Sequence, residues 1–572
     1  MALCWTGKPV SRMADAMTEE NSQALLRRRL RLRPPGGWSL GAMVIAAAVV
    51  GPLAAIIWMA LNPVENIWPH LMATTLPRYL FNTVLLCLGV GGLSAAVGTG
   101  AAWLVTMYRF PGARAFEWLL LFPLAIPAYV GAYALVDFLE YAGPVQTALR
   151  ELFGWQTSRD YWFPEIRSRG AAVIVLAAAL NPYVFLMART AFREQSGCTY
   201  EVAQALGAGP FARFWRVGLP LARPAIAAGS AIVMMETVSD FGVVDFFAVQ
   251  TLTTGIFSTW LEMHNTGGAA QIALVVLTLV LLLVGLEKAS RSRSRFYRLS
   301  RQQRPVEPAP LTGVPGWLAA AACAVPFAVG FVLPVGVMSW HAAGSPERWF
   351  EPGLLRALSH TVAAGGAASV VTVLAALFLV YGVRLSGSRL PRLILPLTTL
   401  GYAAPGAVLG VGILIPLAAL DNRLADGILA LTGFDPGLML TGTAFAMVFA
   451  YCVRFFAIAQ GAVDAAMGRV SPSLPMAARS LGRSPIGALR EIYVPLIRGS
   501  VGTALLLVFV DSVKELPATL LLRPFNYNTL STRVYEHASL ERIGDASPAA
   551  LLVCLVGLAA VLFMARTGRE AT

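Results

Sequence analysis

The sequence predicts an all-α polytopic membrane protein built from two equivalent six-helix halves. Hydrophobic residues make up 57% of the 572 residues and charged residues only 13%, and the mean hydropathy is +0.65. This is far more apolar surface than a soluble fold of this length needs. A polar segment punctuated by glycine and proline also occurs twice, 275 residues apart, each time between long apolar stretches. Such a repeat indicates two halves of equivalent structure.

The positions of the helices follow from apolar runs long enough to cross a hydrocarbon core of ~30 Å. In the first half we expect spans at residues 38–61, 83–107, 118–136, 171–188, about 224–244 and 271–286. In the second half we expect spans at residues 315–340, 361–383, 393–420, 436–452, about 499–520 and 546–565. Acidic residues interrupt the spans at 224–244 and 499–520. The prediction is therefore twelve membrane-spanning helices, six in each half.

The distribution of arginine predicts which parts face the cytoplasm. The predicted halves cover residues 38–290 and 315–566, joined by an Arg- and Ser-rich linker at 291–314, with tails at 1–37 and 567–572. Arginines gather in the first tail, the linker and the first repeated segment, so we expect both termini and both repeated segments on the cytoplasmic side. The net charge of +13 then reflects contact with the inner leaflet of the bilayer. We expect no nucleic-acid partner.

The repeated segment predicts a short helix, a turn and a second helix. The first copy is Glu201-Val-Ala-Gln-Ala-Leu-Gly207 with Val217-Gly-Leu-Pro220, and the second is Met476-Ala-Ala-Arg-Ser-Leu-Gly482 with Ile492-Tyr-Val-Pro495. Glycine at the end of the first helix suits a left-handed turn. Pro210 or Ser484-Pro485 then starts the second helix, with Ser484 as its N-cap. Pro220 and Pro495 are expected to end that helix.

This repeated segment resembles the cytoplasmic coupling loop, or EAA loop, of permease subunits of bacterial ABC importers. The resemblance implies that loops 201–220 and 476–495 bind a separate cytoplasmic ABC ATPase, expected to be a homodimer. The matching positions are Glu201, Ala203, Gly207 and Pro220 in the first loop and Ala478, Gly482 and Pro495 in the second. In the family the first acid of the motif contacts the ATPase. Met476 replaces that acid in the second loop, so we expect the two halves to couple unequally.

No site for ATP is visible in the sequence. The only lysines are Lys8, Lys288 and Lys514, and none lies in the Gly-x-x-x-x-Gly-Lys-Ser/Thr pattern of a phosphate-binding loop. The six cysteines are scattered, and no nucleophile–base or metal constellation stands out. We therefore expect a transport protein with no catalytic residue, no metal site and no cofactor of its own, while the partner subunit uses the ATP.

Four acidic residues fall within apolar stretches at repeated positions. Glu236 and Asp240 are spaced i and i+4, and Asp511 and Glu515 follow 275 residues later. Glu236 lies about 24 Å along a helix from Pro220, within the bilayer, where ionisable groups are costly and usually functional. Two interpretations remain open. The four acids line one translocation path that favours a cationic solute, or they hold helices together, with a lysine at 514 neutralising Glu515.

The residues around these acids carry a narrower resemblance. Residues 239–255, 514–525 and 531–536 are similar to the fused permeases of ferric-iron ABC importers, and the similarity extends over nearly all of the chain beyond residue 38. It implies the type I ABC importer permease fold, a place in the bacterial inner membrane and ferric iron delivered by a periplasmic solute-binding protein. Permeases for phosphonate, thiamine or polyamines share this architecture.

A different class of protein also fits part of the pattern. Ion-driven secondary transporters have two six-helix halves and buried acids as well. The paired coupling loops favour an ABC permease over such a transporter. A scaffold without transport activity would explain the hydropathy but not the repeat.

Overall fold

The computed structural model describes residues 37–292, 306–385, 395–471 and 473–570. The predicted N-terminal tail therefore lies almost wholly outside the described residues, as do 293–305 of the predicted linker and the last two residues of the C-terminal tail. Within the described ranges, eleven helices are long and apolar enough to cross a membrane. A helix pair bent by 94°, Ala113–Ala125 with Ala128–Phe153, would make twelve if it counts as one span. This range includes the predicted total.

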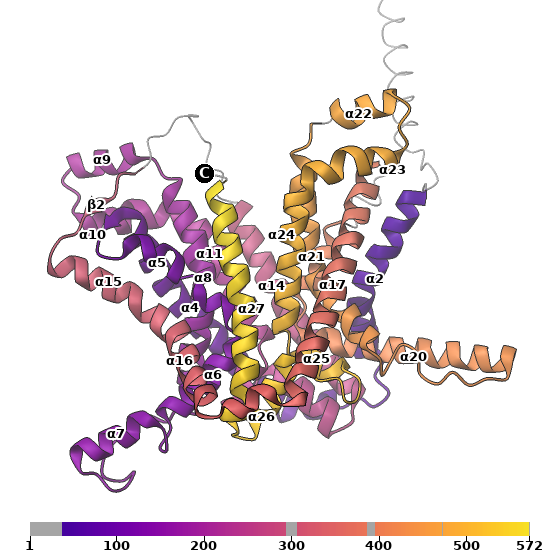
Figure 1. Ribbon diagram of the computed structural model, residues 1–572, viewed down its shortest axis with the longest axis horizontal. Coiled ribbons are helices and arrows are strands. Elements are labelled where there is room, and N and C mark those ends of the chain that lie inside the picture. The colour runs from indigo at the N-terminus through magenta and orange to yellow at the C-terminus, as the bar shows by residue number, and fades with distance from the viewer. Residues whose placement is uncertain (1–36, 293–305, 386–394, 472, 571–572) are drawn as a thin grey trace, which may run out of the picture.

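The first half is an array of helices (Figure 1). Its elements are α2 (Gly37–Leu61), α3 (Trp68–Ala73), α4 (Leu76–Met107), β1 (Tyr108–Arg109), α5 (Ala113–Leu119), η1 (Phe122–Ala125), α6 (Ala128–Leu139), α7 (Pro144–Phe153), α8 (Arg169–Arg193), α9 (Gly197–Ala205), α10 (Pro210–Arg213), η2 (Phe214–Gly218), α11 (Leu219–Ser239), α12 (Gly242–Phe246), α13 (Leu252–Phe257), η3 (Ser258–Glu262) and α14 (Thr266–Ser292).

The second half repeats this order. Its elements are β2 (Ala309–Pro310), α15 (Val314–Phe327), η4 (Ala328–Val332), α16 (Leu333–Gly344), η5 (Pro346–Phe350), α17 (Pro352–Leu385), η6 (Leu397–Thr399), α19 (Leu400–Ala403), α20 (Gly406–Thr432), α21 (Ala444–Gly468), α22 (Ser473–Ser480), α23 (Pro485–Ala488), η7 (Leu489–Tyr493), α24 (Val494–Lys514), α25 (Pro517–Leu522), α26 (Leu530–Ser539) and α27 (Ile543–Glu570). β1 pairs with β2 in parallel.

The repeat extends to the ends of individual helices. α8 and α21 begin and end at positions 275 residues apart, and so do α11 and α24. This register gives each residue of these helices one equivalent in the other half. It is used below to compare the two sides of the central cavity.

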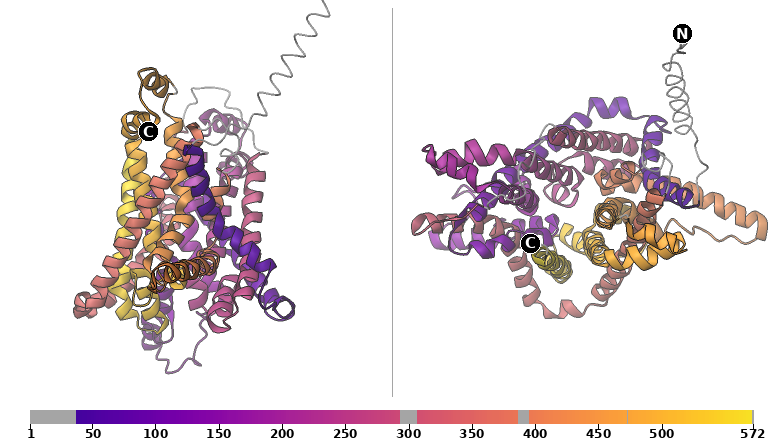
Figure 2. Two further views of the ribbon diagram at one scale, coloured as in Figure 1. Left: turned by 90° about the vertical axis from the view of Figure 1, so that its right-hand side faces the viewer. Right: turned by 90° about the horizontal axis from the view of Figure 1, so that it is seen from above.

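The first helix of the first half packs against the second half. The rings of Trp38 in α2 and Phe378 in α17 stack at 4.8 Å between centroids. A Cβ at Gly412 of α20 would lie 2.5 Å from the carbonyl oxygen of Pro52, so only glycine permits this close approach of α20 to α2. Both views in Figure 2 place α2 beside helices of the second half. In turn, α16 of the second half packs on α6. The halves are therefore interlocked.

Two of the predicted spans are broken helices. The run at 118–136 changes direction at Ile126, and the run at 393–420 does so at Ala404; both residues have extended backbone, with ψ of 128° and 124°. Pro127 and Pro405 follow them, and the residue before a proline is sterically disfavoured in the helical conformation. Each predicted run is therefore broken at this residue, and the run at 118–136 makes one span only if its bent helix pair is counted as one.

A third span was misplaced. The run at 436–452 ended where the apolar residues end, but the helix is α21, which starts at Ala444 and continues to Gly468. Arg454 lies in its interior. The predicted span consisted of uncharged residues only, so it ended before Arg454 and missed the second part of the helix.

Candidate functional site

The first repeated segment folds as a helix, a glycine turn and a second helix. α9 ends before Gly207, whose φ is +81°. The amides of Gly207 and Ala208 donate to the carbonyls of Gln204 and Ala203, both at 2.9 Å. These two bonds form a Schellman turn, which requires a left-handed residue and therefore favours glycine. The predicted turn at Gly207 is confirmed, and the carbonyl of Ala203 is part of it.

The second segment has the same turn. Gly482 also has a φ of +81°. Its amide donates to the carbonyl of Arg479, and the amide of Arg483 donates to the carbonyl of Ala478, both at 3.0 Å. The hydroxyl of Ser484 accepts a hydrogen bond from the amide of Gly487 at 3.1 Å, which confirms the predicted N-cap of the next helix.

The two prolines that follow do not end the second helix. α10, η2 and α11 form one helical rod from Pro210 to Ser239, and the equivalent rod runs from Pro485 to Lys514. Pro220 and Pro495 lie just after a five-residue π-helical stretch in each rod. A proline has no amide to donate to the preceding turn, and the wider π turn accommodates this loss without a break. The prediction that these prolines end the helix was wrong.

The surfaces of the two loops are largely apolar. Leu206 and Leu481, at equivalent positions, are each 82% exposed. Phe211 and Ile486 are also exposed at equivalent positions in the second helix of each loop. Glu201 is exposed, and Met476, its counterpart, is 60% exposed. Exposed apolar patches rimmed by polar residues are typical of protein interaction sites.

The first loop is attached to the membrane helices by aromatic packing. Trp103 of α4 packs against Tyr200 and Phe214, with ring centroids 5.9 and 5.1 Å apart. Burial raises the pKa of the Tyr200 hydroxyl above its usual range, so it stays protonated and contacts the side chain of Gln195. Gln195 donates in turn to the carbonyl of Gly218 at 3.2 Å.

The second loop is attached by a hydrogen bond. The hydroxyl of Tyr381 in α17 donates to the carbonyl of Pro485 at 2.6 Å, at the start of α23. The ring of Tyr381 also meets Tyr493 at 5.5 Å between centroids. The first loop therefore contacts the long helix α4 by aromatic packing, and the second contacts the long helix α17 by a hydrogen bond and a ring contact.

Both loops lie at the same end of the molecule. α9 and α22 stand at the upper end in Figure 1, where α2 begins and α27 ends. α7 and α26 lie at the opposite end. The two loops are therefore placed to contact partners on one side of the bundle.

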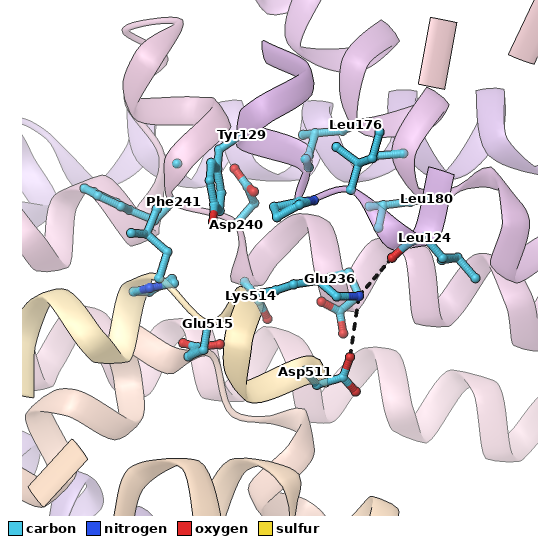
Figure 3. Close-up of a pocket in the computed structure, with 18 of the residues that line it drawn as sticks. Leu124, Tyr129, Leu176, Leu180, Glu236, Asp240, Phe241, Asp511, Lys514 and Glu515 are labelled. Carbon is cyan, nitrogen blue, oxygen red and sulfur yellow. Dashed lines mark hydrogen bonds and ion pairs between the residues drawn. The ribbon is translucent and has the colours of Figure 1, made fainter. Parts of the chain in front are cut away.

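A cavity of about 170 Å³ lies where the two halves meet. All four predicted acids line it: Glu236, Asp240, Asp511 and Glu515 (Figure 3). They come from the ends of α11 and α24 and the residues that follow. The structure thus brings together residues that are 275 positions apart in the sequence.

The acids do not share helix faces as the spacing suggested. α11 ends at Ser239, and Asp240 is extended, with a ψ of 139°. Its carboxylate accepts hydrogen bonds from the amides of Val243 and Val244 at 2.9 and 3.2 Å. Glu515 likewise follows the last residue of α24 and accepts from the amide of Ala518 at 3.1 Å. Each second acid therefore holds the start of the next short helix, and the i, i+4 prediction was wrong here.

Two basic residues also line the cavity. Arg454 in α21 forms an ion pair with Glu515, with Nε 3.1 Å from Oε2. Lys514 donates to the carbonyl of Leu124 at 2.8 Å and lies 3.9 Å from Asp511, as the dashed lines in Figure 3 mark. The expectation that Lys514 neutralises Glu515 was wrong, because Arg454 takes that place.

Sequence reasoning missed Arg454 and Tyr402. The Tyr402 hydroxyl donates to Glu236 at 3.3 Å. Arg454 could have been found from the sequence, because it is a charged residue within an apolar stretch. The 275-residue repeat also pairs it with Ala179, so a comparison of the two halves would have shown the extra charge. Tyr402 gave no such signal, because it is an uncharged residue inside the predicted span at 393–420.

Comparison with known proteins identifies a family over part of the chain. Residues 93–296 match the family described as the binding-protein-dependent transport system inner membrane component. This range includes α8, the first coupling segment and α11.

Relatives extend the match to most of the chain. The Fe(3+)-transport system permease protein FbpB 2 of Haemophilus influenzae is 27% identical over 540 residues, 91% of this chain and 96% of the relative. The ferric transport system permease protein FbpB of Actinobacillus pleuropneumoniae is 24% identical over 82% of this chain and 67% of the relative. The molybdenum transport system permease protein ModB of Escherichia coli is 29% identical, over 38% of this chain and 97% of the relative.

Proposed function

The chain is a fused two-half permease of the binding-protein-dependent transport type, and we propose that it moves ferric iron across the bacterial inner membrane. The observation that carries this proposal is the pair of matching coupling loops on one side of a bundle whose central cavity is lined by both halves. Two loops with the same backbone turn suit a two-fold symmetric motor, and a shared cavity suits alternating access to one solute.

Iron is favoured by two independent points. The relatives that match most of the chain carry iron transport in their names. The cavity also holds four carboxylates against two basic groups, so its field attracts a cation and repels an anion such as sulfate. Hard cations bind oxygen ligands of this kind.

The energy source in this proposal is a separate cytoplasmic ATPase dimer. Exposed leucines at the turns, Leu206 and Leu481, offer each loop an apolar surface for it. Glu201 supplies a carboxylate that can pair with a basic group of the ATPase. Met476 cannot form such a pair, so the two loops should contribute unequally. ATP belongs to the partner, and this chain binds no cofactor.

The sides of the membrane follow from this assignment. The end with the coupling loops faces the cytoplasm, together with both termini. The opposite end, with α7 and α26, then receives the ferric ion from a periplasmic solute-binding protein.

Two alternatives have different test outcomes. A permease for another solute, such as a phosphonate, thiamine or a polyamine, would keep the ATPase dependence but not the iron. An ion-driven secondary transporter would keep transport without the ATPase.

The test is uptake of ⁵⁵Fe³⁺ in a strain deleted for this gene and complemented with it. Loss of ferric uptake on deletion, and its restoration only together with an ATPase partner, are expected. Normal ferric uptake in the deletion strain would overturn the iron assignment. ATP-independent uptake would overturn the ABC mechanism. Saturable ATP binding by the purified chain alone would contradict the proposal that a separate subunit binds the ATP.

A further inference from the structure

A groove with two compartments lies at the end of the molecule opposite the coupling loops. The larger compartment, of about 790 Å³, lies between the end of α6 and the helical rod of η4 and α16. The smaller, of about 540 Å³, lies between the end of α16, η5 and the start of α27. Asp137, Trp340 and His341 line both compartments, which are therefore neighbours. The groove follows the seam of the two halves, close to where α16 packs on α6 (Figure 1).

The larger compartment is apolar and follows a membrane-spanning helix. Its second-half wall belongs to the rod Val314–Gly344, which is long and apolar enough to cross a membrane. The wall residues recur at the i, i+3, i+4 spacing of one helix face: Val329, Val332, Leu333, Gly336 and Val337. A Cβ at Gly336 would meet nothing within 4 Å, so the groove is open there. This compartment suits a hydrocarbon chain.

The junction of the two compartments has the character of a membrane interface. Trp340 stands there and is 81% exposed. Tryptophan is enriched where hydrocarbon meets the polar headgroups. Beside it, Nε2 of His341 in the second half lies 2.8 Å from Oδ2 of Asp137 in the first. The apolar compartment is therefore at the depth of acyl chains, and the polar one is at the level of headgroups.

The polar compartment has one surplus positive charge. Arg348 and Arg542 both pair with Asp545: Nε of Arg348 lies 2.9 Å from Oδ1, and Nη2 of Arg542 lies 2.6 Å from Oδ2. The side chain of Asp545 is 10% exposed, whereas that of Arg542 is 61% exposed. One carboxylate cannot neutralise two guanidinium groups. Arg542 therefore offers donors to a further anion, and arginine suits phosphate in particular.

The rim of the groove has the opposite surplus. Glu140, from the larger compartment, and Glu541, from the smaller, both pair with Arg167, at 3.3 and 2.7 Å. One guanidinium cannot neutralise two carboxylates. The side chains of both glutamates are partly exposed and can accept from a further cationic donor. The groove thus presents a positive and a negative group next to an apolar channel.

Glu541 stands where a turn would favour glycine. It follows α26 with a φ of +60°, and the amides of Glu541 and Arg542 donate to the carbonyls of Ala538 and His537 at 3.0 and 2.9 Å. This is the kind of turn seen at Gly207, in which the left-handed position favours glycine. The turn itself therefore does not explain the carboxylate.

We propose that this groove binds one phospholipid with a zwitterionic headgroup, of the phosphatidylethanolamine type. An acyl chain fills the apolar compartment, the phosphate accepts from Arg542, and the ammonium donates to Glu541 and Glu140. Phosphatidylglycerol has no ammonium, and the quaternary nitrogen of phosphatidylcholine has no N–H to donate. The bound lipid contacts both halves at their seam. The proposal goes beyond the proposed function and does not depend on the solute, because none of these residues lines the central cavity.

The test counts the lipids retained by the purified full-length permease in native mass spectrometry. The protein is titrated in one detergent with dioleoyl phosphatidylethanolamine, phosphatidylglycerol or phosphatidylcholine. One phosphatidylethanolamine should bind saturably, at least about threefold more tightly than the other two lipids. Gly336→Leu fills the apolar compartment and should weaken binding at least about tenfold, because it displaces methylene groups. Gly366→Leu in α17 is the matched control at another helical glycine with open space and should bind as the unaltered protein does.

Two further variants test the headgroup contacts. Arg542 and Glu541 are mostly exposed, and asparagine tolerates a left-handed backbone, so Arg542→Gln and Glu541→Asn should both fold. Arg542→Gln should weaken binding of all three lipids, because they share the phosphate. Glu541→Asn should remove the preference for phosphatidylethanolamine and leave the other two lipids unaffected.

Three results would overturn the proposal. Equal binding of the three lipids, or unchanged binding in Gly336→Leu, would mean that only a general lipid shell is present. Loss of lipid in Gly336→Leu without any effect of the two headgroup variants would mean an acyl-chain groove with no headgroup site. A mass of two chains without bound lipid would mean that a second copy covers the groove. Should Gly336→Leu fail to assemble, the two headgroup variants decide.

Discussion

The two coupling loops have the same backbone, yet the two halves place different side chains on it. Both turns have a glycine φ of +81° and the same pair of turn hydrogen bonds. The outer surface carries Glu201 in one loop and Met476 in the other. The same contrast recurs in the cavity, where Arg454 of α21 stands at the position equivalent to Ala179 of α8, and both residues line the cavity. The comparison teaches that the two halves keep the backbone of the repeat while side chains at equivalent positions differ in charge.

The largest difference between the halves should be in the stability lost when Glu515 or its equivalent Asp240 is neutralised. Glu515→Gln leaves Arg454 buried without its counter-charge, so we expect a loss of ~3–5 kcal/mol in stability. Asp240→Asn keeps an oxygen that can accept from the amides of Val243 and Val244, so we expect a loss of ~1 kcal/mol or less. Thermal unfolding of both variants in the same detergent checks this. Equal shifts in melting temperature would show that the two acids contribute equally to stability, against the expected difference between the halves.

The turns should behave alike in the two halves. A β-branched residue at Gly207 or Gly482 must adopt a left-handed conformation, at a cost of ~1–2 kcal/mol or more, although open space surrounds both positions. Gly207→Val and Gly482→Val should therefore uncouple ATP hydrolysis from uptake while insertion into the membrane stays normal. Asparagine tolerates this conformation and serves as the matched control at each site. Full coupling in both valine variants would show that the turn geometry is not needed.

Much of this comparison could be predicted from the sequence, because it depends on local chemistry. The turns at Gly207 and Gly482 and the cap at Ser484 follow from residue types at fixed offsets. The ion pair of Arg454 with Glu515 could not be predicted, since it joins α21 to the end of α24 through packing that no spacing encodes. The effect of Pro220 and Pro495 was also missed, because a π turn absorbs a proline that would end an ordinary helix.

The contact with the ATPase should be weaker after a change in the first loop than in the second. Glu201→Ala removes a charge that can pair across the interface, and we expect the dissociation constant of the ATPase to rise about tenfold. Met476→Ala removes only part of an apolar contact and should have a smaller effect. Co-purification titrations of the two variants against the unaltered chain measure the difference. Equal losses would mean that the two loops couple equally.

The smallest effect is expected at the anchors of the loops. Tyr381→Phe removes the hydrogen bond to the carbonyl of Pro485 and should lower stability by ~1 kcal/mol. The main consequence should be that α23 is held less firmly against α17. Trp103→Phe in the first half keeps an aromatic ring and loses only part of the packing against Tyr200 and Phe214. Hydrogen exchange of the two coupling segments should show faster exchange in the second loop of Tyr381→Phe alone. The same change in both loops would show that the anchors are not independent.

Transport through the acid-lined cavity is the central claim, and one measurement tests it most directly. Proteoliposomes containing the permease, its ATPase and a ferric-loaded binding protein are assayed for ⁵⁵Fe³⁺ uptake with Glu236→Gln, Asp240→Asn, Asp511→Asn and Glu515→Gln. Uptake by Glu236→Gln and Asp511→Asn should fall at least about tenfold while assembly and melting temperature stay close to those of the unaltered protein. Normal uptake in all four variants would contradict the account, whatever their stability.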